Sequence, residues 1–332
     1  MIKGYAVGIS GTGSALPEKV LTNLDLEKMV DTTDEWIRTR TGIGSRRIAD
    51  DKTATSDLST EAAKKALADA NLKAEDLDLI IVATVTPDMA FPSTACIVQK
   101  NLGAVKAAAF DIEAACTGFI YALTIAEQFI KNGVYKNALV IGAETLSKVL
   151  DWEDRNTCVL FGDGAGAVVV ERTEEGMGIL SSYLGADGGN GEALTQPAGG
   201  SRIPASLHSV ENKLHYVKMD GSEVFKFAVR AMGKAAMEAL RLGGMELEDI
   251  DFLIPHQANI RIIEGSAKRL KLPMEKVYVN LDKYGNMSAA SVPVALDEVV
   301  RNGLIKKNDK VVMVAFGGGL TWGSTLMKWS KD

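Results

Sequence analysis

The chain has 332 residues, 46% of them hydrophobic, and a formal net charge of −6. This length suits a large core or two ordinary domains, and the charge excludes a globally basic surface for nucleic acid or anionic lipid. No apolar run approaches the roughly 18 residues of a membrane span, and "MIKGYAVGISGTGS" lacks the apolar core of a signal peptide. The three cysteines match no metal-ligand spacing. We expect a cytoplasmic protein with no metal, nucleic-acid partner or membrane attachment.

A helix, an acidic turn and a buried strand occur twice along the chain. The segment "AAKKALADANLKAEDLDLIIV" from Ala62 resembles "AAMEALRLGGMELEDIDFLIP" from Ala235 without a gap, at an offset of 173 residues. Further on, "YALTIAEQFIKNG" (121–133) resembles "VALDEVVRNG" (294–303), and an apolar strand follows each. Apolar helix–strand patterns can resemble one another by chance, but the repeated order favours two related halves.

Strands made almost entirely of Val, Ile and Leu alternate with helices, which predicts an α/β protein whose sheets are covered on both faces. The charged stretch "ERTEEGMG" (171–178) ends in glycine and is a natural joint. We therefore predict an N-terminal half over residues 1–175 and a C-terminal half over 176–332. Residues 185–218 are polar and hold two of the three histidines. We interpret them as an insertion or cap at the start of the second half.

Cys116 lies where the apolar run "AFDIEAAC" meets the amphipathic pattern "CTGFIYALTIAEQFIKNG". A thiolate at a helix N-terminus is stabilised by the unpaired N–H groups and the macrodipole, so we expect a lowered pKa there. The alternative is a buried structural cysteine, because free cysteine is among the most buried residue types. We expect that alternative for Cys96 and Cys158. For Cys116, position alone favours neither interpretation.

Two later residues could act with this thiol. His256 directly follows the second repeated strand, and open α/β sheets place their ligands at such strand ends. Asn286 precedes the helix that the repeat places opposite the helix at Cys116. If a pseudo-twofold axis relates the halves, the two helix N-termini approach each other. Cys116, His256 and Asn286 then form a thiol nucleophile with an imidazole and an amide nearby. The alternative for His256 is a histidine satisfied within the core.

Two glycine-rich stretches remain. In "AFGGGLTWGS" (315–324), three consecutive glycines allow close backbone approach, and their N–H groups could donate to an oxyanion, although a plain tight turn would look the same. The stretch "GDGAGA" (162–167) superficially fits a dinucleotide-binding motif, but it precedes a strand rather than a helix. We therefore expect no dinucleotide site there.

The motifs "ACTGF", "PHQAN", "GNMSAASVP" and "AFGGGLTWG", in this order and spacing, resemble the β-ketoacyl-acyl-carrier-protein synthase III family of the thiolase superfamily. "VDTTDEWIRTRTGI" and "FGDGAGA" also fit, and the resemblance covers essentially the whole chain. It implies a thiolase-like fold of two related halves in five layers, αβαβα. Elongating synthases use two histidines, and thiolases carry a second, late cysteine, whereas no cysteine follows Cys158 here.

The resemblance implies a decarboxylative Claisen condensation that starts fatty acid synthesis. Cys116 would take an acyl group, expected to be acetyl, from acyl-CoA, and the N–H groups of Cys116 and Gly319 would hold the oxyanion. Malonyl-acyl carrier protein would then lose carbon dioxide, while His256 and Asn286 stabilise the enolate. Because decarboxylation itself generates the carbanion, we expect a site without an acidic residue, a metal or a cofactor.

The resemblance also implies the binding residues. Trp36 and Arg155 would sandwich the adenine of coenzyme A, which suits an aromatic face and a guanidinium, and Thr32 and Arg40 would reach its phosphates. Phe91 would enter the partner's acyl pocket in a homodimer. The residues that match the lining of the pantetheine tunnel are Gly221, Phe225, Ala258 and Asn259.

Acyl carrier proteins are acidic, so an acidic enzyme needs a basic docking patch. In "QANIRIIEGSAKRLKL", Arg261 and Lys268 are seven residues apart and share a helix face. Lys226 and Arg269 would extend this patch. An ordinary solvated helix face would look the same.

Three rival functions share parts of this pattern. A cysteine hydrolase could use the same Cys–His–Asn set, but it would admit water and need no carrier-protein patch. A non-catalytic thioester-binding protein would not need the complete triad. Plant-type polyketide synthases share the triad but are usually longer.

Overall fold

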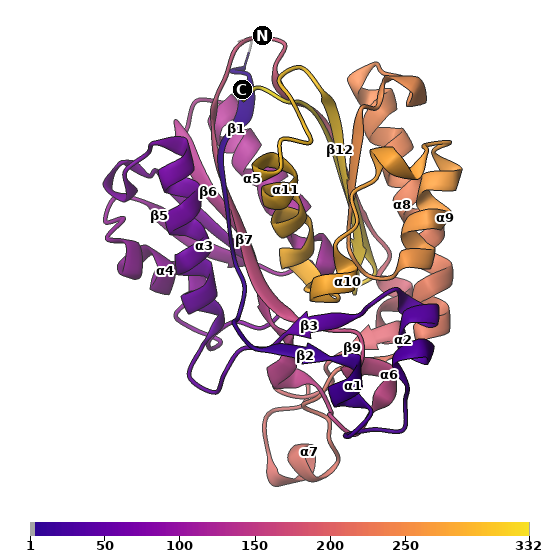
Figure 1. Cartoon of the computed structure of the whole chain (residues 1–332). Helices are drawn as coiled ribbons and strands as arrows, with labels where there is room; N and C mark the ends of the chain where they lie inside the picture. The colour runs from indigo at the N-terminus through magenta and orange to yellow at the C-terminus, as the bar shows by residue number, and fades with distance from the viewer. Residues whose placement is uncertain (1–3, 332) are drawn as a thin grey trace.

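The computed structural model describes residues 4–331, which form two main β-sheets (Figure 1). The first sheet has the order β1-β7-β6-β4-β5 and the second the order β11-β12-β13-β8. The first comprises β1 (Val7–Ala15), β4 (Leu79–Ala83), β5 (Ala108–Ile112), β6 (Asn137–Thr145) and β7 (Asp163–Arg172). The second comprises β8 (Gly178–Ala186), β11 (Phe252–Pro255), β12 (Lys310–Gly317) and β13 (Thr321–Lys328).

Four strands of the first sheet, β1, β7, β6 and β4, have counterparts in the second sheet, whereas β5 has none. Strands β4 and β6 pair in parallel, while β7 is antiparallel to both β6 and β1. In the second sheet, β11 and β12 pair in parallel, while β13 is antiparallel to both β12 and β8. The starts of β4 at Leu79 and β11 at Phe252 keep the offset found in the sequence. The prediction of two related halves is confirmed, while the domain border at 175/176 stays a prediction.

Helices cover both sheets and fill the space between them (Figure 1). Helices α3 and α4 cover the first sheet, α5 and α11 lie between the sheets, and α8 covers the second sheet with α9 packed against it. This is the five-layered αβαβα arrangement. The helices are α3 (Thr55–Ala70), α4 (Thr94–Leu102), α5 (Gly118–Lys131), α8 (Gly221–Gly243), α9 (Ile260–Arg269) and α11 (Ser291–Arg301).

The central layer holds the site in place. Helices α5 and α11 bury side chains against both sheets, as Phe119, Leu123, Val292 and Leu296 show with no exposed surface or almost none. On the outer face, α3 packs very closely on β1, because a Cβ atom at Gly11 would lie 2.3 Å from the carbonyl oxygen of Ala66. Only glycine permits this approach. The two central helices therefore start from fixed positions between rigid sheets.

Shorter elements gather at one end of the molecule (Figure 1). They are β2 (Val20–Thr22), α1 (Asn23–Leu26), α2 (Asp34–Thr41), β3 (Ser45–Arg47), α6 (Arg155–Cys158), β9 (Leu194–Thr195), α7 (Leu207–Glu211), β10 (Lys218–Met219) and α10 (Leu281–Tyr284). The 3₁₀ turns used below are η2 (Ala115–Thr117) and η7 (Ser288–Ala290). The polar segment 185–218 mostly lies between β8 and α8, as predicted for an insertion, and it includes α7.

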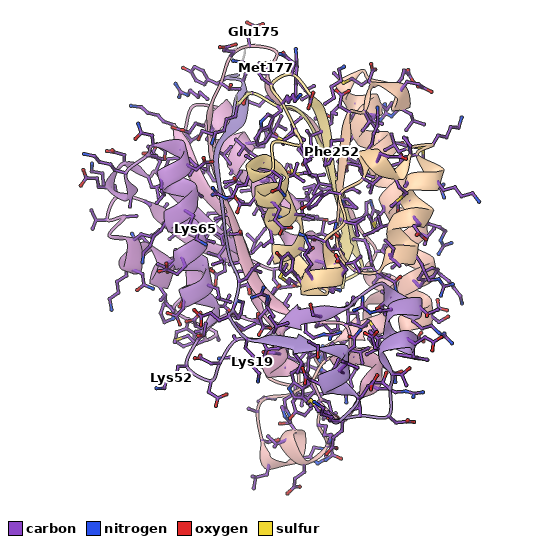
Figure 2. All side chains as sticks on the ribbon, in the orientation of Figure 1. Lys19, Lys52, Lys65, Glu175, Met177 and Phe252 are labelled. Atoms are coloured by element: carbon purple, nitrogen blue, oxygen red, sulfur yellow. The ribbon has the colours of Figure 1, made fainter. Side chains whose placement is uncertain are left out.

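Lys19, Lys52 and Lys65, which are labelled in Figure 2, are exposed charged residues, whereas Arg46, Glu144 and Asp163 are buried. Across residues 4–331, no helix combines the length and the apolar character needed to cross a membrane. The glycines of "GDGAGA" lie at the start of β7 rather than in a phosphate-binding loop. A Cβ atom at Gly166 would lie 2.6 Å from the backbone nitrogen of Val294, so this glycine serves close packing against α11.

Candidate active site

Cys116 lies in η2, directly before α5, and is 6% exposed. Ala115 adopts a positive φ of 45°, so the chain turns sharply from β5 into the helix. Gly317, at the end of β12, lies against this turn, because a Cβ atom there would be 2.6 Å from the Cys116 nitrogen. The turn at Ala115 and the close approach of Gly317 together fix the position of Cys116 at the helix start that the sequence predicts. Cys116 there lines a cavity.

The expected fall in the pKa of Cys116 is wrong for this structure. The pKa of the thiol is raised to about 12, chiefly by burial and in smaller part by the carboxylates of Glu144 and Glu113. The nearby Ser288 hydroxyl opposes this shift only in part. Desolvation disfavours a thiolate more strongly than the helix start favours it. The Cys116 thiol is therefore neutral in this structure.

His256 and Asn286 join Cys116 in the lining of one cavity of about 560 Å³. His256 directly follows β11 and is fully buried, and Asn286 lies in the loop before η7 with 8% of its surface exposed. The turns η2 and η7 contact each other between the sheets, so the two helix starts do approach. The structure thus brings the thiol, the imidazole and the amide to one cavity.

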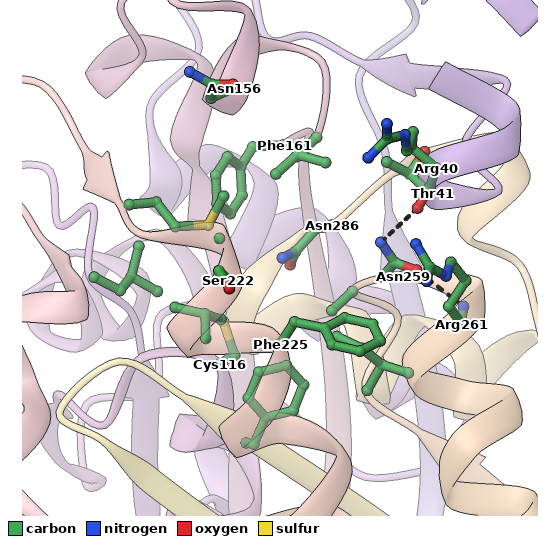
Figure 3. A pocket seen from close by; sticks show the side chains of 18 of the residues that line it. Arg40, Thr41, Cys116, Asn156, Phe161, Ser222, Phe225, Asn259, Arg261 and Asn286 are labelled. Carbon is green, nitrogen blue, oxygen red and sulfur yellow. Dashed lines mark hydrogen bonds between the residues drawn. The ribbon is translucent and has the colours of Figure 1, made fainter. Parts of the chain in front are cut away.

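The orientation of Asn286 follows from one backbone contact. Its Oδ1 accepts a hydrogen bond of 2.8 Å from the Ser288 N–H. The oxygen is thereby fixed, and the Nδ2 amine remains available as a donor to a ligand in the cavity. Figure 3 shows Asn286 at the middle of this cavity, with Cys116 and Phe225 on one side and Arg40 and Asn259 on the other.

His256 is neutral. Burial lowers its pKa to about 3, and no nearby carboxylate offsets this shift. Among residues 4–331, Nε2 has no hydrogen-bond partner, and Phe316 packs edge-on against the ring with centroids 5.4 Å apart. Phe316 also lines the cavity. A buried ring nitrogen without a partner is suited to meet a polar atom of a substrate.

An acidic residue does lie behind the site, contrary to the expectation. Glu144 ends the apolar part of β6 and is fully buried. Its carboxylate accepts hydrogen bonds from Thr86 Oγ1 at 2.6 Å and from the Val85 N–H at 3.1 Å. Ser288 lies near enough to lower the pKa of both Glu144 and Cys116, although its hydroxyl forms no hydrogen bond of normal geometry. Glu144 thus anchors the loop after β4 beneath the thiol.

Burial raises the pKa of Glu144 from 4.5 to about 7. A raised carboxyl pKa stabilises the fold below the unfolded-state pKa, and this contribution is lost as pH rises through 7. We expect Glu144→Gln to remove this dependence, which changes the free energy of unfolding by about 2.5 kcal/mol between pH 5 and pH 8. Denaturant unfolding of both proteins at pH 5 and pH 8 measures it. A stability difference that stays constant between these pH values would contradict the shift.

Gly319 lies at the tip of the β12–β13 turn, where its φ is 129°. It lines a second cavity of about 410 Å³ together with Cys116, Ser288 and Gly318. Gly317 makes the closest approach to Cys116. The role of the Gly319 N–H as an oxyanion donor stays a prediction.

Six of the eight predicted coenzyme A residues line the larger cavity, and Thr32 and Arg155 do not. The six are Trp36, Arg40, Gly221, Phe225, Ala258 and Asn259. In Figure 3, Asn259 Nδ2 donates to the carbonyl oxygen of Arg40 at 3.0 Å, which joins α9 to the end of α2. The cavity therefore runs from Cys116 toward the residues predicted to bind coenzyme A.

Trp36, which lines this cavity, lies next to Arg155. The guanidinium carbon of Arg155 is 5.2 Å from the Trp36 ring centroid, and Arg155 Nη1 also donates to the Asp31 carbonyl oxygen at 2.7 Å. A purine stacked between two groups needs a gap of about 7 Å, twice the normal contact distance. Arg155 must therefore move outward if the two residues sandwich an adenine.

The predicted basic patch has two parts. Lys226 and Arg261 line the larger cavity, while Lys268 and Arg269 lie exposed at the far end of α9. Arg261 and Lys268 are separated by about 10 Å along the helix axis. Lys226 is already paired with Glu223 at 2.7 Å.

Phe91 lies in the loop between β4 and α4 and is 85% exposed, an unusual position for a large apolar side chain. Cys158 is fully buried, as predicted. The prediction that Cys96 is buried is wrong. Cys96 is exposed in the first turn of α4, and its Sγ lies 3.7 Å from the Ala109 carbonyl oxygen.

Sequence reasoning missed several lining residues. They include Phe316, Ser288, Leu194, Met219, Val85 and Val217. Leu194 and Met219 belong to the short β9–β10 pair, so the polar insertion contributes apolar side chains to the cavity. A strand of two residues gives no periodic signal from which this role could be predicted.

Known proteins resemble this chain over its whole length. The family model for 3-oxoacyl-[acyl-carrier-protein] synthase III matches residues 110–188. A second model, for the C-terminal part of the same family, matches residues 240–329. The β-ketoacyl-[acyl-carrier-protein] synthase III of Caldanaerobacter subterraneus is 69% identical over 331 residues, covering 100% of both chains. That of Clostridioides difficile is 60% identical, covering 97% of this chain and 98% of the relative.

Solved structures of this family have the same fold as this chain. The 3-oxoacyl-[acyl-carrier-protein] synthase III of Aquifex aeolicus superposes with a TM-score of 0.90 at 53% identity, covering 98% of this chain and 100% of the other. The enzyme of Pseudomonas aeruginosa gives a TM-score of 0.91 at 41% identity, with coverages of 98% and 99%. The fold is therefore thiolase-like, as predicted.

Proposed function

This chain belongs to the β-ketoacyl-[acyl-carrier-protein] synthase III family, the condensing acyltransferases that initiate fatty acid synthesis, and we propose that Cys116, His256 and Asn286 carry out its two half-reactions. The observation that supports this assignment is the meeting of these three side chains, from separate elements, at one cavity. The proposed substrates are acyl-CoA, with acetyl as the expected primer, and malonyl-acyl carrier protein. No cofactor takes part.

In the first half-reaction, the Cys116 sulfur attacks the thioester carbonyl of acyl-CoA. The tetrahedral intermediate carries its negative charge on oxygen, and the N–H groups of Cys116 and Gly319 donate to it. Collapse of the intermediate expels coenzyme A as its thiolate and leaves the acyl group on Cys116. The proton lost by the Cys116 thiol balances the one that the coenzyme A thiolate takes up.

In the second half-reaction, malonyl-acyl carrier protein occupies the same cavity. Its carboxylate leaves as carbon dioxide, and the electron pair of the broken bond forms an enolate whose charge rests on the thioester oxygen. His256 Nε2 and Asn286 Nδ2 donate hydrogen bonds to that oxygen. The enolate carbon then attacks the acyl group on Cys116, giving the β-ketoacyl product and expelling the sulfur as a thiolate, which takes up a proton from solvent to restore the thiol. Glu144 lies behind the thiol, bound to the loop after β4, so it takes no part in holding the enolate.

A reconstitution assay tests this function. The protein is incubated with labelled acetyl-CoA and malonyl-acyl carrier protein, and carbon dioxide and labelled β-ketoacyl product are measured. We expect both products only when both substrates are present. Release of free acetate without a new carbon–carbon bond would instead indicate the cysteine hydrolase, and binding without turnover would indicate the non-catalytic thioester-binding protein.

The basic residues of α9 are proposed to dock the carrier protein. We expect Lys268→Glu to raise KM for malonyl-acyl carrier protein and to flatten its salt dependence. Charge attraction across a solvated surface governs encounter, and the Debye length is about 8 Å at 0.15 M salt. Steady-state kinetics across a salt series measure both effects. Lys268 suits this test better than Arg261, because Arg261 lines the cavity itself.

The matched control is Lys52→Glu, which reverses an exposed charge at a different part of the surface (Figure 2). It should leave KM unchanged. Malonyl-CoA offered in place of the carrier-bound donor should be used equally well by Lys268→Glu and the unaltered protein. Equal losses with both donors would place the docking surface elsewhere.

The exposed Phe91 supports the proposal of a homodimer in which each chain lends this ring to the partner's acyl pocket. Burial of a large apolar side chain at an interface removes it from water at a favourable free energy. We also propose that the enzyme works in the cytoplasm.

A further inference from the structure

Ser291 provides the hydrogen-bond partner of the His256 ring among residues 4–331. Its Oγ lies 2.5 Å from His256 Nδ1, and both side chains are fully buried. Ser291 begins α11, while His256 follows β11 on the other side of the cavity floor. The second ring nitrogen, Nε2, has no partner in the described part of the chain. One serine hydroxyl therefore determines the hydrogen-bond state of the whole ring.

The Ser291 hydroxyl has one hydrogen and two acceptors within reach. These are Nδ1 and the Ser288 carbonyl oxygen, which lies 2.9 Å away. If the hydrogen points to Nδ1, the ring proton must reside on Nε2. If it points to Ser288, then Nδ1 must carry the ring proton, and Nε2 is left with a bare lone pair.

Two observations and one requirement of the proposed reaction favour the first arrangement. The Ser288 carbonyl oxygen already accepts a hydrogen bond from the Ser291 backbone N–H, so it does not need the hydroxyl. The short Oγ–Nδ1 distance suits an O–H donor better than an N–H donor, because O–H hydrogen bonds are the shorter class. The enolate oxygen also requires a donor at Nε2, which the second arrangement does not supply.

We propose that Ser291 is a positioning residue whose hydroxyl donates to His256 Nδ1 and thereby keeps the imidazole proton on Nε2, facing the enolate. This inference rests on the proposed function and deepens it. The ring stays neutral in its buried environment, so the tautomer alone decides whether Nε2 donates or accepts. Ser291 touches no substrate and acts only through His256. Transacylation does not use Nε2 as a donor and is independent of Ser291.

Nitrogen-15 NMR of the unaltered protein tests the tautomer directly. The chain contains three histidines, so selective labelling gives few resonances, and those absent from His256→Asn belong to His256. We expect Nε2 to have the shift of a protonated nitrogen and Nδ1 that of an unprotonated, hydrogen-bonded nitrogen. In Ser291→Ala, the two shifts should move toward an average of the tautomers. A proton on Nδ1 in the unaltered protein would overturn the proposal, whatever the enzyme's activity.

Kinetics test the consequence. We expect Ser291→Ala to slow malonyl decarboxylation roughly tenfold, the effect of losing one hydrogen bond, and to leave transacylation to Cys116 unchanged. Ser291→Thr keeps the hydroxyl and should restore decarboxylation. The matched control is Ser324→Ala, because Ser324 is also fully buried but donates to the Met313 carbonyl oxygen at 3.0 Å, within the second sheet. It should change neither half-reaction.

Other outcomes have distinct meanings. Equal losses of both half-reactions in Ser291→Ala, or no recovery in Ser291→Thr when its transacylation is normal, would overturn the positioning role. Failure of the unaltered protein to condense acetyl-CoA with malonyl-acyl carrier protein would instead overturn the proposed function. The NMR measurement on that same protein would still decide which nitrogen carries the proton.

Discussion

Replacement of Cys116 by alanine is expected to abolish formation of the acyl-enzyme and, with it, all β-ketoacyl product. No other thiol lines either of the two cavities that meet at η2 in the described part of the chain. Serine in its place should also fail, because a buried hydroxyl is a far weaker nucleophile than sulfur. Mass spectrometry of the protein after incubation with labelled acetyl-CoA measures the covalent label.

The other two cysteines provide the controls. Cys158 is fully buried outside both cavity linings, while Cys96 is exposed on α4. Cys96→Ala is the more demanding control, because an exposed thiol can react slowly with any thioester in solution. Cys96→Ala and Cys158→Ala should each acquire one label on Cys116 at the normal rate. A label that persists in Cys116→Ala and disappears in Cys96→Ala would reject Cys116 as the nucleophile.

The duplicated sequence was sufficient to predict how the site is assembled. An offset of 173 residues places β11 where β4 lies, and the same relation sets η7 against η2. Since the chain must twice form the same helix–strand unit, residues at equivalent ends of the two halves meet near the axis between them. That is why Cys116 and Asn286, far apart in sequence, could be placed together without a structure.

Side-chain direction and exposure were less predictable. Glu144 ends a strand that reads as continuously apolar, and only its neighbours on the loop after β4 reveal that its carboxylate is bound within the protein. Ser291 is the second serine of "SAASVP", a run of small residues that gives no signal of its hydrogen-bond partner 35 positions away. The helix that holds Cys96 has nine residues, which is too short for the hydrophobic pattern to show which side chains are buried and which are exposed.

The pKa of Cys116 illustrates a different limit. The sequence correctly places the thiol at a helix start, where the dipole favours a thiolate. Depth is not encoded in that pattern, and in the folded chain only 6% of the Cys116 surface is exposed. Desolvation grows with burial, whereas the dipole effect at one helix end stays small. The direction of the pKa shift therefore follows from the three-dimensional packing around the sulfur.

Removal of either enolate donor is expected to slow malonyl decarboxylation by roughly 10²–10³-fold, the usual effect of losing one oxyanion donor. His256→Ala removes Nε2, and Asn286→Ala removes Nδ2. Transacylation to Cys116 should decline much less, because backbone N–H groups hold its oxyanion. Release of carbon dioxide from malonyl-acyl carrier protein and labelling of Cys116 by acetyl-CoA measure the two half-reactions separately.

Asn286→Asp removes the Nδ2 donor while keeping the shape of the side chain. Aspartate retains an oxygen that can accept the Ser288 N–H, which Asn286 Oδ1 does at 2.8 Å, so η7 should keep its position. It replaces the Nδ2 donor with a second oxygen, which repels the developing enolate. We therefore expect Asn286→Asp to lose decarboxylation at least as severely as Asn286→Ala, with transacylation preserved. If aspartate instead decarboxylates better than alanine, Asn286 acts by supporting the turn, and His256 alone stabilises the enolate.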